Sequence, residues 1–84
     1  MTETIEDRIL RLTAARGAEK SICPSEVARE MGDPWQRHMT LVRQAAVRLA
    51  RAGKLEVLRK GKPVTDLEEL RGVIRLRAIR PETQ

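Results

Sequence analysis

The sequence is poor in the residues that build disulfides, metal sites and aromatic surfaces. Its 84 residues include one cysteine, Cys23, one histidine, His38, and one aromatic side chain, Trp35. A single cysteine excludes a disulfide within the chain and leaves a cysteine-based metal site without a second sulfur ligand. Proteins that bind single-stranded nucleic acid stack bases on several aromatic rings, so the composition argues against this class of function.

Long hydrophobic runs are also missing. The longest uninterrupted apolar run is Ala45–Val47, far short of the roughly 20 residues that a transmembrane helix needs. The first residues include Glu3, Glu6 and Asp7, whereas a secretory signal begins with basic residues. These absences predict a cytoplasmic protein of bacterial type that has no membrane partner.

No catalytic constellation can be assembled from the sequence. His38 has no second histidine or cysteine at ligand spacing, and Cys23 has no resolving cysteine, so we interpret both as packing residues. Gly61 and Gly72 belong to no phosphate-binding glycine motif. We therefore predict that the chain is not an enzyme and has no catalytic residue, no metal-binding residue and no cofactor.

Charge is what the chain has in abundance, and the positive part is concentrated in the middle. Charged residues make up 35% of the sequence and hydrophobic residues 40%, which is typical of a globular domain. The formal net charge is +5, but residues 34–64 contain eight Lys or Arg against one Glu, which is +7. No Asp or Glu occurs from Pro34 to Leu55. A segment of this kind attracts polyanions.

Hydrophobic periodicity predicts a first helix over Glu3–Arg16, because apolar residues recur there at helical spacing. Thr2 or Thr4 is the expected N-cap, and Gly17 is expected to end the helix. The connector that follows contains Ser21–Cys23, which is long enough for a very short strand.

Two further helices are predicted in the middle of the chain. Pro24 favours the start of the second helix, and Gly32 is expected to end it after about eight residues. Asp33 is the expected N-cap of a third helix over Pro34–Ala52, which Gly53 ends. Because a short glycine-containing turn joins these two helices, their spacing is that of a helix-turn-helix.

The last third of the chain predicts two strands. Polar and apolar residues alternate over Lys54–Val57 and again over Ile74–Ala78, and the basic loop Arg59–Pro63 lies between them. A hairpin directly after a long helix forms a wing. Three helices followed by a two-stranded β-hairpin predict an α+β winged-helix fold, with a single domain over residues 1–80 and a frayed tail over residues 81–84.

One side of the predicted third helix is basic. Its core side contains the larger apolar residues, while Arg43 lies at the border and Val47 edges the polar side. As the second helix of a helix-turn-helix it would enter the major groove of DNA, with its N-terminal half at the bases. The predicted DNA-binding site comprises base contacts from Arg37, Thr40 and Gln44, phosphate contacts from Arg48, Arg51 and Lys54, and wing contacts from Lys60 and Lys62.

Nearly the whole chain, from about Ile5 to Arg77, contributes stretches that together match a known pattern. These stretches are Ile22–Arg29, Trp35 with Met39, Val42–Arg43, Ala45–Ala46, Leu49–Ala50, Ala52–Gly53, Leu55–Val57, Lys60–Val64 and Arg71–Arg77. In them the sequence resembles a family of small bacterial proteins known as a domain of unknown function. The resemblance implies a winged-helix fold, and it implies neither an activity nor any site residue.

The function we expect is binding of double-stranded DNA, in the manner of a transcriptional regulator, through the basic third helix and the wing. One alternative is a protein-interaction module whose basic face meets an acidic partner or a second copy of the chain. Another is a solvated basic face without a specific partner. The acidic segment Thr65–Leu70, which looks like a capped helical turn, argues against DNA binding unless it points away from the phosphates.

Overall fold

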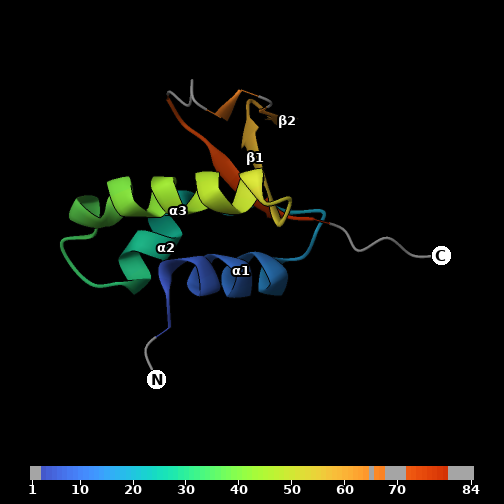
Figure 1. Ribbon diagram of the computed structural model, residues 1–84. Coiled ribbons are helices and arrows are strands. Elements are labelled where there is room, and N and C mark those ends of the chain that lie inside the picture. The colour runs from blue at the N-terminus through green and yellow to red at the C-terminus, as the bar shows by residue number, and fades with distance from the viewer. Residues whose placement is uncertain (1–2, 65, 68–71, 80–84) are drawn as a thin grey trace.

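The helical half of the chain packs against a small antiparallel sheet (Figure 1). The computed structural model describes residues 3–64, 66–67 and 72–79. Within these residues the element order is α1 (Ile5–Arg16), α2 (Pro24–Glu30), the 3-10 helix η1 (Trp35–His38), α3 (Met39–Arg51), β1 (Leu55–Arg59), β2 (Lys62–Pro63) and β3 (Arg75–Ala78). In Figure 1, α1 lies along one side of α3, and the strands rise beyond the opposite side. The described chain is therefore α+β.

Local hydrogen bonds define the two longer helices. Thr4 caps α1 as expected, because its Oγ1 accepts a hydrogen bond of 3.0 Å from the backbone N–H of Asp7. At the far end of α3, the N–H of Gly53 donates to the carbonyl of Ala50 at 3.1 Å, and the following N–H donates to the carbonyl of Leu49 at 2.9 Å. These two bonds form a Schellman motif, which needs the positive φ of 75° that glycine adopts readily. The predicted roles of Thr4 and Gly53 are confirmed, although α1 begins at Ile5 rather than Glu3 and α3 ends at Arg51 rather than Ala52.

The expected start of the third helix at Pro34 is wrong. The backbone of Pro34 is extended, with ψ of 127°, and η1 lies between it and the first residue of α3. Trp35 of η1 is half-buried against the core, and the guanidinium of Arg29 on α2 lies 4.9 Å from its ring centroid. Packing of this large side chain against α2 thus overrides the local preference for one continuous helix.

The predicted pairing of the two alternating segments is confirmed. β1 and β3 are antiparallel, and Val57 lies opposite Leu76 in their register. On the other side of β3, Ile22 forms a bridge with Leu76 through two backbone hydrogen bonds of 2.8 Å. The short extended stretch between α1 and α2 therefore joins the far edge of the sheet.

The sheet has three strands rather than the two expected, in the order β2-β1-β3. The chain turns at Lys60 and Gly61, with φ of 53° and 80°, and Lys62 then pairs with Arg59. Two successive positive φ values are typical of a type I′ hairpin turn, which usually has Asn-Gly or Asp-Gly at its centre. Because this turn has lysine in the first position, the sequence pattern predicts a loop where β2 lies.

A single group of buried side chains holds the helices and the sheet together. It draws on α1, α2, α3, β1 and β3, and on residues next to them, and comprises Ile9, Ile22, Val27, Ala28, Val42, Ala45, Ala46, Leu49, Leu55, Val57, Ile74 and Leu76. The buried polar side chain Thr13 donates a hydrogen bond of 2.9 Å to the carbonyl of Ile9, so its hydroxyl is satisfied. None of the helices in the described ranges is long and apolar enough to span a bilayer.

Two expected features fall where the structure gives no description. Of the acidic turn predicted over residues 65–70, only residues 66 and 67 are described. The tail predicted to fray, residues 81–84, lies wholly outside the described residues.

Replacing Leu76 by Ala should lower the free energy of unfolding by about 2–5 kcal/mol, because truncating a buried leucine leaves a cavity. Leu76 is 0% exposed. Val73→Ala is the matched control, since Val73 is 79% exposed and its truncation is expected to change stability by less than about 0.5 kcal/mol. Urea unfolding followed by circular dichroism measures both variants, and equal effects would contradict the assigned core.

Candidate nucleic-acid interface

The two sides of α3 differ sharply in burial. Its buried side consists of Val42, Ala45, Ala46 and Leu49, which face α1, α2 and β1. The opposite side exposes Thr40, Gln44, Arg48 and Arg51. Because the buried residues fix the rotation of the helix about its axis, these polar side chains are held toward solvent.

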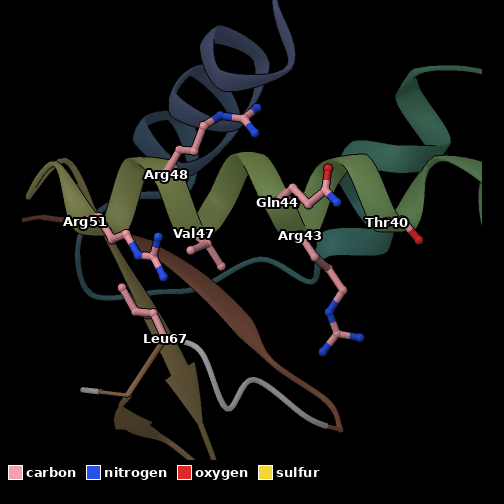
Figure 2. A pocket seen from close by; sticks show the side chains of 7 residues that line it. All are labelled: Thr40, Arg43, Gln44, Val47, Arg48, Arg51 and Leu67. Carbon is pink, nitrogen blue, oxygen red and sulfur yellow. The ribbon is translucent and has the colours of Figure 1, made fainter.

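A groove of about 540 Å³ runs along this exposed side (Figure 2). Six of its lining residues come from α3, and the seventh comes from the segment between β2 and β3: Thr40, Arg43, Gln44, Val47, Arg48, Arg51 and Leu67. Among the described residues, the lining includes three arginines and no carboxylate. An open, positively charged groove of this kind suits an elongated anionic ligand.

The structure gathers four of the eight predicted site residues around the groove: Thr40, Gln44, Arg48 and Arg51. Arg43, Val47 and Leu67 also line it and are not among the predicted site residues. For Arg43 and Val47 a signal exists, because both lie at the edge of the polar side on a helical wheel. No sequence pattern identifies Leu67, which the folding of the chain after β2 brings to the groove.

The other four predicted residues lie outside the groove. Arg37 belongs to η1 rather than to α3, Lys54 follows the end of α3, and Lys60 and Lys62 lie at the turn between β1 and β2. All four are exposed. Within the described part of the chain, none of their side chains forms a hydrogen bond or an ion pair.

Arg48 has a carboxylate partner that the sequence of the helix does not reveal. Its Nε lies 2.9 Å from Oε2 of Glu6, which α1 supplies. The hydrogen bond from Arg48 lowers the pKa of the Glu6 carboxyl and raises the pKa of the guanidinium. The Arg48 side chain is still 57% exposed, and exposed ion pairs contribute only about 0–1 kcal/mol. A phosphate approaching the groove can therefore compete for this arginine.

Arg43 and Arg51 keep their charges available to a ligand. Nη2 of Arg43 donates a hydrogen bond of 2.7 Å to the carbonyl of Gly72, which ties α3 to the residues before β3 without neutralising the charge. Arg51 forms neither a hydrogen bond nor an ion pair within residues 3–64, 66–67 and 72–79. In Figure 2 both side chains lie on the side of the sheet, whereas Arg48 points toward α1.

Four acidic groups, those of Glu3, Glu26, Glu30 and Glu56, are paired with arginines away from this surface. Arg11 binds Glu3 at 2.8 Å and also contacts Glu30, so α1 and α2 are linked by a charge network. Glu56 is the only acidic residue of the basic segment 34–64, and it binds Arg77 on β3 at 2.6 Å. It therefore neutralises none of the cations of that segment. The positive field is left on α3 and the β1–β2 turn.

Cys23 and His38, the only cysteine and the only histidine of the sequence, are both half-buried. Ser25 donates a hydrogen bond of 3.1 Å from Oγ to Sγ of Cys23, and His38 ends η1. Across the described residues, no group of three His, Cys, Asp or Glu side chains could hold a metal ion.

The chain belongs to the family described as a protein of unknown function (DUF3253), whose model matches residues 2–79. This match confirms the resemblance to a domain of unknown function. No curated protein matches the sequence.

Stability should fall as the pH drops below about 4.3, the ordinary pKa of a glutamate. Hydrogen bonds lower the pKa of Glu3, Glu6 and Glu26 in the folded chain, from arginines for the first two and mainly from the backbone N–H of Cys23 for Glu26. A carboxyl with a lower pKa folded than unfolded stabilises the fold above its unfolded pKa, and this contribution is lost as the pH falls through its folded pKa.

Urea unfolding between about pH 7 and about pH 3 measures this dependence. Glu26→Gln, which keeps a hydrogen-bond acceptor but cannot titrate, should give a flatter curve than the unmodified chain. A free energy of unfolding that does not change over this range would contradict the assigned hydrogen bonds.

Proposed function

We propose that this member of the DUF3253 family is a winged-helix protein that binds double-stranded DNA, in the manner of a transcriptional regulator. The exposed side of α3 would enter the major groove, and the β1–β2 turn would contact the backbone or minor groove nearby. The observation that supports this most directly is the groove along α3, which three arginines line and to which none of the described carboxylates contributes.

The order and pairing of the elements support a winged-helix arrangement. Three α-helices precede the strands, and Ile22, between α1 and α2, bridges to the outer strand β3. The β1–β2 hairpin directly follows α3 and rises beyond it in Figure 1, where a wing is expected. Lys60 and Lys62 place two exposed cations at its turn.

The dimensions of α3 suit the major groove. That groove is about 12 Å wide and admits one helix. The 13 residues of α3 extend over about 20 Å at 1.5 Å per residue, so the helix can contact several successive base pairs. The arginines would contact phosphates on the two walls of the major groove. Release of the counterions condensed on these phosphates would supply much of the affinity.

The chain should bind a mixed-sequence duplex of about 20 base pairs with an affinity that falls steeply with salt. If about four or five phosphates are neutralised, the slope of log K against log salt should be roughly −4. Fluorescence anisotropy of a labelled duplex at several salt concentrations measures this slope. Failure to bind even at low salt would refute the proposal.

Two variants locate the binding surface in the same assay. Arg51→Ala should weaken binding to all sequences alike and reduce the salt slope by about 1, because it removes one phosphate contact. Lys20→Ala is the charge-matched control, since Lys20 is exposed but lies in the connector between α1 and α2. Two results together would favour a protein-interaction module instead. One is that both variants bind the duplex as tightly as the unmodified chain does. The other is that the chain still captures one acidic protein, in stoichiometric amount, after nuclease treatment.

Glu6→Gln should strengthen DNA binding, by up to about fivefold, because it frees Arg48 and removes a negative charge at the edge of the groove. The same titration measures the effect. Asp7→Asn is the control, because Asp7 is an exposed acidic neighbour on α1 with no ion pair among the described residues. An effect no larger than that of Asp7→Asn would show that DNA does not use Arg48.

A further inference from the structure

We propose that the α3 groove prefers A·T base pairs and that Val47 contacts the 5-methyl group of thymine. This inference rests on the proposed binding of double-stranded DNA and states which bases the groove recognises. It comes from the arrangement of neutral and charged side chains in the groove, and it assigns a role to two residues that charge alone leaves unexplained, Gln44 and Val47.

The neutral side chains that α3 contributes to the groove lie between Arg43 and Arg48 on the circumference of the helix, and Arg51 falls in the same sector one turn after Val47. At about 100° per residue, Val47, Thr40 and Gln44 fall within about 60° of the α3 circumference. Arg43 lies about 40° beyond one edge of this sector, and Arg48 lies about 40° beyond the other. In Figure 2, Arg43 extends on the side of the sheet, while Arg48 extends toward α1. From Thr40 to Val47 this pattern places neutral groups at the groove floor and Arg43 and Arg48 toward the two phosphate walls, while Arg51 adds a cation at the C-terminal end of the helix.

Gln44 is available for base contacts. It is exposed and lines the groove. In the part of the chain that the structure describes, its side-chain amide takes part in no hydrogen bond. The amide offers a donor and an acceptor side by side, which match N7 and the 6-amino group of adenine in the major groove.

Val47 supplies an apolar surface beside this amide. It lies three residues after Gln44, so the two side chains are neighbours on the helix surface, about 4.5 Å apart along the axis. The half-buried Leu67 lines the same groove from across it, which extends the apolar surface. Of the four bases, only thymine presents a methyl group in the major groove, and apolar side chains contact it. A cytosine amino group at this place would find no acceptor on valine or leucine.

The test compares three duplexes of equal length that differ in one feature at a time: alternating A·T, alternating G·C, and alternating A·T with every thymine replaced by deoxyuridine. Deoxyuridine keeps the base pairing and removes only the methyl group. The unmodified chain should bind the A·T duplex most tightly. Loss of one buried methyl contact should weaken binding by about fourfold for the deoxyuridine duplex.

Val47→Ala should narrow the difference in affinity between the thymine and deoxyuridine duplexes, because most of the apolar surface that contacts the methyl is gone. Arg51→Ala is the matched variant in the same groove; it should weaken binding to both duplexes and keep the difference between them. Circular dichroism confirms that each variant is folded, and the comparison of thymine with deoxyuridine on the unmodified chain needs no variant at all.

The outcomes separate this inference from the function on which it rests. Equal binding of the thymine and deoxyuridine duplexes by the unmodified chain would overturn the methyl contact. Equal or tighter binding of the G·C duplex would overturn the A·T preference. In both cases DNA binding itself would stand, whereas absence of binding to all three duplexes at low salt would overturn the proposed function and this inference with it.

Discussion

Four buried residues of α3, Val42, Ala45, Ala46 and Leu49, hold this helix against α1, α2 and β1. Two of the four are alanines, so the neighbouring elements approach the helix axis closely. The chain contains a single aromatic side chain, and its core therefore depends on many aliphatic contacts of this kind. Any rotation of α3 about its axis would break these contacts, so the opposite side of the helix stays exposed to solvent.

The fixed orientation of α3 determines which charges the molecule exposes. The buried side uses the apolar residues of the basic segment, so its arginines and lysines are left outside. Glu3, Glu30 and Glu56 are paired with arginines away from the groove, and Glu6 reaches the groove through Arg48. Because that pair is exposed, it limits the positive field without cancelling it.

The same packing explains why the groove is both charged and apolar. Arg43 bonds to the carbonyl of Gly72, which holds the segment before β3 beside α3. Leu67, from the same connection, then faces Val47 and Arg51 across the groove (Figure 2). A surface that combines arginines with aliphatic and amide groups can discriminate among ligands as well as attract them, since charge alone carries no sequence information.

Much of this architecture follows from local patterns in the sequence. The caps at Thr4 and Gly53, the alternation over β1 and β3, and the concentration of cations in residues 34–64 are all visible there, because each depends on neighbours along the chain or on a short repeat. Four of the predicted site residues lie together for the same reason, since helical spacing places them on one side of α3.

Contacts between residues distant in the sequence determine the features of the fold and the groove that local patterns do not predict. The packing of Trp35 against α2 shortened the third helix, and pairing of Lys62 with Arg59 formed a third strand at a Lys-Gly turn. The partner of Arg48 lies 42 positions away on α1, and Leu67 reaches the groove only because the chain returns after β2. Local propensity cannot report such contacts, because their free energy comes from side chains that meet only when the whole core has formed.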